Sequence, residues 1–86
     1  MKKTLTFHTD PAHGWLEVDL ADLQTLNISD QISHYSYTKG NKVYLEEDCD
    51  APHYLQAATA YGWNIEPINR HTNHDSFIRA LPRWEV

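Results

Sequence analysis

The segment Ile32–Glu47, with the sequence ISHYSYTKGNKVYLEE, carries the pattern that decides the fold. Gly40 and Asn41 are a residue pair typical of a two-residue hairpin turn. We therefore predict two antiparallel strands, over residues 32–37 and 42–47. The expected cross-strand pairs are Tyr37 with Tyr44, Thr38 with Val43, Tyr35 with Glu46, and His34 with Glu47.

A second hairpin is predicted at the start of the chain. Residues 4–8 alternate between apolar and polar side chains, and residues 15–18 alternate again, which is typical of half-buried strands. Asp10-Pro11 favours a turn between them, and Gly14 ends that loop. The side chains expected to face inward are Leu5, Phe7, Leu16 and Val18, and those expected to face outward are His8, Trp15 and Glu17.

Two helices follow from capping signals. Asp19 is a predicted N-cap, and Asn27 a left-handed stop, for a short helix with Asp22 in its first turn. Asp50 is a predicted N-cap for a second helix, with Pro52 in the first turn and Gly62 as the stop. The apolar face expected for the second helix consists of Tyr54, Leu55, Ala58 and Tyr61.

The last third of the chain is predicted to add a strand and a short helix. Residues 63–68 favour a strand, and Pro67 places it at the edge of a sheet because proline cannot donate to a ladder. Asn73 could cap a helix that runs to Leu81 and docks through Phe77, Ile78 and Leu81.

These elements predict one domain over residues 1–86 with an α+β fold. We expect a small antiparallel sheet of about five strands built from hairpins, with two helices on one face and a short C-terminal helix. The short loops favour hairpins, and the pattern of a parallel strand-helix-strand crossover is weak.

Composition narrows the class of protein. The chain is 41% hydrophobic, which is too apolar for a disordered protein, and Cys49 is its only cysteine, so an internal disulfide is excluded. No apolar run approaches the length of a membrane span, and the sequence fits a cytoplasmic protein. The net charge of −5 argues against binding nucleic acid through the whole surface and leaves a basic protein partner open.

Two histidine-containing segments, 7–15 and 71–77, are the strongest chemical candidates. If the fold joins them, they form a polar pocket, and zinc or a similar divalent ion is possible there with His8, Asp10, His71 and His74 as ligands. If it does not, they are turn and cap residues, and Asp75 pairs with Arg79. The candidate pocket residues are His8, Asp10, His13, Trp15, His71, His74 and Asp75.

Three weaker features accompany the histidines. Cys49 with His53 resembles a nucleophile and base, but the carboxylates around Cys49 raise the pKa of its thiol, so a small, partly buried residue is favoured. A tyrosine face and an acidic run predict an interaction surface made of Tyr35, Tyr37, Tyr44, Glu46, Glu47 and Asp48. Nucleic-acid contact would use that face with Lys39, Lys42, Arg79 and Arg83.

Three runs also carry a resemblance: residues 7–16, 44–51 and 71–79 are similar to small uncharacterised bacterial proteins carried by phages, plasmids or integrated elements. The resemblance implies an accessory protein that acts by binding, and it implies no activity. We therefore expect a chain that binds a protein partner or itself, with no cofactor. The alternatives are a small metal-dependent or histidine-based enzyme and a nucleic-acid-binding module.

Overall fold

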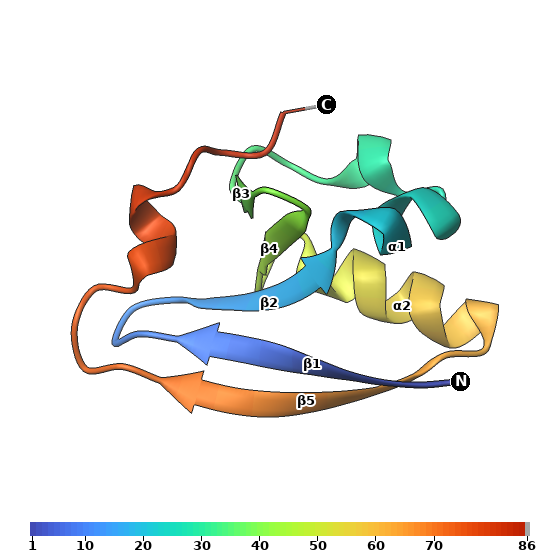
Figure 1. Cartoon of the computed structure of the whole chain (residues 1–86), viewed down its shortest axis with the longest axis horizontal. Helices are drawn as coiled ribbons and strands as arrows, with labels where there is room; N and C mark the ends of the chain where they lie inside the picture. The colour runs from blue at the N-terminus through green and yellow to red at the C-terminus, as the bar shows by residue number, and fades with distance from the viewer. Residues whose placement is uncertain (86) are drawn as a thin grey trace.

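The computed structural model describes residues 1–85 and has the predicted α+β fold (Figure 1). Within those residues, none of the helices has the length and apolar character needed to cross a membrane. The elements in chain order are β1 (Lys2–Thr9), β2 (Gly14–Asp19), α1 (Leu20–Thr25), a 3-10 helix (Ser29–Gln31), β3 (Tyr37–Lys39), β4 (Lys42–Glu46), α2 (Ala51–Tyr61), β5 (Asn64–His71) and a second 3-10 helix (Phe77–Ala80).

The five-stranded sheet has the order β3-β4-β2-β1-β5 and is mixed, whereas the sequence predicted an antiparallel one. Strands β1 to β4 pair antiparallel, but β5 runs parallel to β1, with Asn64 beside Lys2 and His71 beside Thr9. Helix α2 is the reason, because a helical connection can carry the chain past two strands and return it in the same direction. Strands β4 and β5 are thus joined by the crossover that the sequence pattern showed only weakly.

The hairpin of β3 and β4 is confirmed around its Gly40-Asn41 turn, but β3 is shorter than predicted and shares only Tyr37 with the strand predicted over residues 32–37. Tyr37 pairs with Tyr44 and Thr38 with Val43, as expected. Strand β3 begins only at Tyr37, so the predicted pairs of Tyr35 with Glu46 and His34 with Glu47 are wrong.

The buried carboxylate of Asp50 explains this shortening. Asp50 occupies the N-cap position of α2 but makes no capping hydrogen bond. It accepts hydrogen bonds from the backbone N–H and hydroxyl of Ser33 and from the hydroxyl of Ser36. Ser36 in turn accepts from the backbone N–H of Glu46 at 2.9 Å. Residues 33–36 are therefore held over the start of α2 by polar contacts between distant positions, which strand periodicity does not encode.

Each face of the sheet carries a buried core. One core lies on the helical face, where Leu16, Val18 and Leu45 pack with Tyr54 of α2. A second core consists of Trp15, Tyr44 and Ile78, with Tyr37 and Leu81 packed against it. Adjacent strand residues point to opposite faces, so this second core lies on the other side of the sheet, which the C-terminal segment covers (Figure 1). The prediction that Trp15 faces outward is wrong, because only 2% of its surface is exposed.

The ends of the helices agree with the sequence in part. Asn27 follows α1 with a left-handed φ of 57°, and Gly62 ends α2 with a φ of 98°, both as predicted. Leu55 and Tyr61 of α2 are exposed, so they do not belong to its buried face as expected. The C-terminal helix predicted from Asn73 is only the 3-10 helix Phe77–Ala80, which the Ser76 hydroxyl caps by accepting from the N–H of Ile78. Of the three predicted docking residues in this segment, Ile78 and Leu81 pack against the sheet, whereas Phe77 is about half exposed.

Gly14 illustrates how tightly the first hairpin joins the rest of the sheet. A Cβ atom at this position would lie 2.7 Å from Cζ of Phe7 and 2.9 Å from Oε2 of Glu47. The Glu47 side chain can move aside, but the Phe7 ring packs against the core. We therefore expect Gly14→Ala to lower the free energy of unfolding by about 1 to 3 kcal/mol, measured by urea denaturation. An unchanged denaturation midpoint would contradict this close approach.

Candidate functional site

The two histidine-containing segments lie side by side because β1 and β5 are parallel neighbours whose C-terminal ends, Thr9 and His71, lie together (Figure 1). Thr9 is the register partner of His71, and the Thr9 hydroxyl lies 2.8 Å from Nδ1 of His71. The fold therefore brings segments 7–15 and 71–77 together, which was the condition for a shared pocket.

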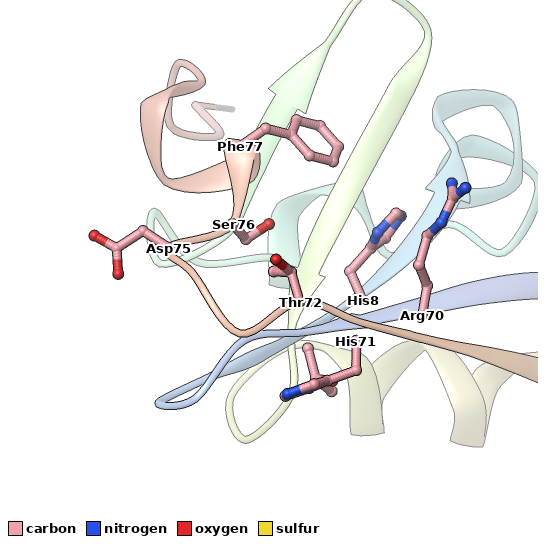
Figure 2. Close-up of a pocket in the computed structure, with 8 residues that line it drawn as sticks. His8, Arg70, His71, Thr72, Asp75, Ser76 and Phe77 are labelled. Carbon is pink, nitrogen blue, oxygen red and sulfur yellow. The ribbon is translucent and has the colours of Figure 1, made fainter.

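The side chains of these histidines nevertheless do not converge. His8 is the register partner of Arg70, and Thr9 that of His71, so the alternation of a strand places His8 and His71 on opposite faces. Figure 2 shows His8 and Arg70 on one side of the strands and His71 on the other. His13 and His74 are exposed. The residues considered as zinc ligands are thus not assembled into one group.

Across residues 1–85, the groups able to bring three metal-ligating side chains together are limited to Glu46, Glu47 and Asp48. Oε1 of Glu46 already accepts hydrogen bonds from the backbone N–H groups of Asp48 and Cys49. These carboxylates lie at the surface, where acidic groups commonly gather without an ion. The cluster therefore does not by itself indicate a metal.

Asp10 is an anchor within the fold. Its Oδ1 accepts from the N–H groups of Ala12 and His13, and its Oδ2 accepts from Ser76 N–H at 3.0 Å. Arg79 binds both oxygens, through Nε at 2.6 Å and a terminal nitrogen at 3.0 Å. The prediction that Arg79 pairs with Asp75 is therefore wrong, and Asp75 is exposed. The Arg79 guanidinium, with these backbone donors, outweighs burial and holds the pKa of Asp10 far below its usual value.

A pocket of about 280 Å³ lies beside His8 (Figure 2). Nε2 of His8 lies 2.8 Å from Oε1 of Glu17, an arrangement that can orient an imidazole for proton transfer. His8 is 6% exposed, and its ring makes edge contacts with the rings of Tyr44 and Phe77, with 5.7 Å between the ring centroids in both cases. His8 is thus packed into the wall of the pocket. The residues lining this pocket are His8, Thr9, Arg70, His71, Thr72, Asp75, Ser76 and Phe77.

Sequence reasoning did not link His8 to Glu17, although a signal for the pair was present. His8 faces Trp15 across the first hairpin, and Glu17 lies two residues further along the same strand. Residues two apart on a strand share a face, so Glu17 is a diagonal neighbour of His8. The predicted register was sufficient to find this contact.

A larger hollow of about 410 Å³ opens on the same face of the sheet, beside the second core. The Arg79 guanidinium lies 5.5 Å from the ring of Trp15, and that of Arg83 lies 5.2 Å from the ring of Tyr37. The rings of Trp15 and Tyr37 meet edge to face at 6.3 Å. We call this hollow the arginine-aromatic groove. Its lining residues are His13, Trp15, Tyr35, Tyr37, Glu46, Asp48, Cys49, Arg79 and Arg83.

No family model matches the chain. The searches of curated proteins and of solved structures likewise give no match. A fold by itself does not assign a function, so the assignment depends on the geometry and chemistry of the site.

The groove combines residues that the sequence analysis had placed in different sites. Four members of the predicted interaction surface line it, namely Tyr35, Tyr37, Glu46 and Asp48. Tyr44 of that surface is buried beneath, at 5% exposure, so the three tyrosines do not form one exposed platform. Glu47 lies outside the lining. His13 and Trp15 come from the predicted histidine pocket, and the two arginines come from the nucleic-acid alternative.

Cys49 lies at the rim of the groove and is exposed, so the expectation of partial burial is wrong. A hydrogen bond to Glu46, together with the charges of Asp50 and Asp48, raises the pKa of its thiol. The direction is the one predicted from the acidic run. A raised pKa leaves little thiolate at neutral pH, which makes Cys49 a poor nucleophile.

Proposed function

We propose that this chain is a protein-binding module that holds a segment of its partner in the arginine-aromatic groove. The observation that carries the proposal is the composition of the groove, in which Trp15, Tyr35, Tyr37, Arg79 and Arg83 line one hollow. Tryptophan, tyrosine and arginine dominate the binding energy of protein interfaces, because they combine large apolar area with hydrogen bonding.

The groove is also held in shape before any partner arrives. Asp10 fixes the position of Arg79, and Arg79 lies over Trp15. Trp15 itself is almost fully buried and cannot change rotamer without disturbing the second core. A preformed site loses less conformational entropy on binding, which supports a docking role.

The charges around the groove favour a protein partner over a nucleic acid. Of the four cations considered for phosphate contact, Lys42 is paired with Asp19, and Arg79 is paired with Asp10. Glu46, Asp48 and Arg83 all line the groove, so the site offers both signs of charge. A phosphate backbone needs a local excess of positive charge, whereas a protein segment with mixed charges would be complementary here.

The proposed setting is that of a small cytoplasmic accessory protein, of the kind carried by phages, plasmids or integrated elements. In that setting the chain would act by occupying a surface of its partner. The packed position of His8, with rings on two sides, supports binding over turnover at the neighbouring pocket.

The test is a comparison of two double variants as immobilised baits. Tyr35→Ala with Arg83→Ala removes two exposed residues of the groove, and the control variant Tyr61→Ala with Lys39→Ala removes an exposed tyrosine and an exposed cation outside its lining. We expect proteins that bind the natural chain and the control variant to bind the groove variant at least about tenfold more weakly, since truncated hot-spot residues each cost more than about 1 kcal/mol. Equal retention by both variants would contradict the proposal.

A further inference from the structure

Within residues 1–85, strand β5 is an open edge of the sheet, with no element beyond it (Figure 1). It spans eight residues, of which Ile65 is partly buried and the others are exposed. The opposite edge, β3, has only three residues, and the C-terminal segment covers it through the bridge between Tyr37 and Arg83 and the bond from Thr38 N–H to the carbonyl of Pro82. The sheet therefore has one long unpaired edge in the described chain.

The free backbone groups of β5 follow from its register. Asn64 N–H donates to the carbonyl of Met1, and Thr72 N–H donates to that of Thr9. Since a strand alternates in the direction of its backbone groups, the even-numbered residues of β5 turn toward β1 and the odd-numbered ones turn outward. Pro67 is one of the outward residues, so its missing N–H costs the sheet no internal hydrogen bond, and its predicted edge position is confirmed.

We infer that β5 pairs antiparallel with β5 of a second copy of this chain, about a two-fold axis at Ile68. The two five-stranded sheets then form one continuous sheet. The outward residues meet each other in this register: Ile65 faces His71 of the second copy, and Pro67 faces Asn69. Side chains of the even-numbered residues pair as Ile68 with Ile68 and Glu66 with Arg70.

Charge complementarity selects both the occupant and the register. Glu66 and Arg70 are exposed and of opposite sign, and in this register each faces the other across the axis. Centring the pair on Pro67 would place Glu66 opposite Ile68 and Arg70 opposite Asn64, so the two charges would not face each other. Centring it on Asn69 would place Ile68 opposite Arg70. Of these registers, only the one about Ile68 places Glu66 opposite Arg70.

The apolar surface of the edge also fits a second copy. Ile68 is 54% exposed and would be covered by its own counterpart at the axis. On the helical face, a hollow of about 160 Å³ borders β5, and Leu55 of its lining is 41% exposed. Charges and proline commonly protect an edge strand from pairing. In this register the charges face partners of opposite sign, and Pro67 leaves the Asn69 carbonyl of each copy without a donor, while the outward N–H groups of Ile65, Asn69 and His71 still donate across the axis. Glu66 also forms an ion pair with Lys2, at 2.9 Å. Because this pair is exposed it contributes little to stability, so it does not prevent Glu66 from pairing with Arg70 of the second copy.

Sedimentation of the full chain over a wide concentration range tests this inference with a charge swap. We expect the natural chain to shift from monomer to dimer as concentration rises. Glu66→Arg and Arg70→Glu each place like charges across the axis, so each should raise the dissociation constant at least about tenfold. The double variant Glu66→Arg with Arg70→Glu restores the complementary pair and should restore the dimer. Circular dichroism checks that all three variants remain folded.

Amide hydrogen exchange locates the interface independently. The N–H groups of Asn69 and His71 point outward and should become protected as concentration rises. Those of Ile68 and Arg70 turn toward β1 and should be protected at all concentrations, which provides an internal control. A chain that stays monomeric at every concentration would overturn the inference, whether the edge is then free or takes a strand from a different protein. A double variant that fails to restore the dimer would also overturn it. The groove and its proposed role do not depend on this result.

Discussion

Replacing Asp10 with alanine is expected to lower the free energy of unfolding by about 3 kcal/mol or more. The Asp10 side chain is fully buried and accepts from the N–H groups of Ala12, His13 and Ser76 as well as from Arg79. Its removal leaves these donors without an acceptor, and unsatisfied buried groups are costly. The midpoint of thermal unfolding should fall by at least about 10 °C.

Two matched variants separate the roles of charge and shape at this anchor. Asp10→Asn keeps an oxygen that can accept from the loop but loses the ion pair with Arg79, so its stability should lie between those of the natural chain and Asp10→Ala. Asp75→Asn removes the exposed carboxylate that the sequence had paired with Arg79, and it should change stability by less than about 0.5 kcal/mol. A larger effect for Asp75→Asn than for Asp10→Asn would contradict the observed pairing.

The pH dependence of stability gives a further readout of Asp10. The pKa of Asp10 in the folded chain is depressed, chiefly by Arg79, below its ordinary value of 3.8. The group therefore contributes stability that is present above pH 3.8 and is lost as the pH falls from there toward the folded pKa. Urea denaturation across this acidic range should show a steeper loss for the natural chain than for Asp10→Asn. Equal slopes would mean that the carboxylate gains nothing from ionisation in the fold.

The parts of the fold that local signals specify were predictable. The Gly40-Asn41 turn identified the β3–β4 hairpin, and Gly62 identified the end of α2, because each depends on the conformational preferences of one or two residues. Pro67 correctly placed its strand at an edge. The direction of β5 was not predictable in this way. It depends on α2 crossing over two strands, which returns the chain to the far side of β1 in the same direction as β4.

The C-terminal segment was mispredicted because it is held by contacts far away in the sequence. Asp10 and Arg79 are separated by 69 positions, so no local pattern shows that this pair forms. A helical spacing of four residues suggested Asp75 as the partner of Arg79. Arg79 instead binds the buried carboxylate of Asp10, which also accepts from three backbone N–H groups. Similarly, Ser33 and Ser36 leave the predicted strand to satisfy Asp50.

The sequence predicted which segments form the candidate site, but not which of their side chains lie together. Sequence reasoning found the segments that lie together at the ends of β1 and β5, yet it could not tell that His8 and His71 point to opposite faces until the register was known. Likewise, the groove joins Trp15 from one predicted site to Arg79 and Arg83 from another. The separation of the histidines follows from the register of β1 and β5. The groove exists because the C-terminal segment covers the second face of the sheet, which alternation alone had assigned to solvent.

That second face should depend strongly on Ile78. This residue has no exposed surface and packs in one cluster with Trp15 and Tyr44, so Ile78→Ala leaves a cavity in a core of only a few side chains. We expect a loss of about 2 to 5 kcal/mol in the free energy of unfolding, together with a change in the near-ultraviolet circular dichroism of Trp15. Ile68→Ala is the matched control, because it removes the same atoms from a side chain that is 54% exposed. At concentrations where the chain is monomeric, the control should lose less than about 0.5 kcal/mol. If the two variants are equally stable, the C-terminal segment does not form a second core. The groove, which is lined by Trp15 of that core and by arginines of that segment, would then not be preformed.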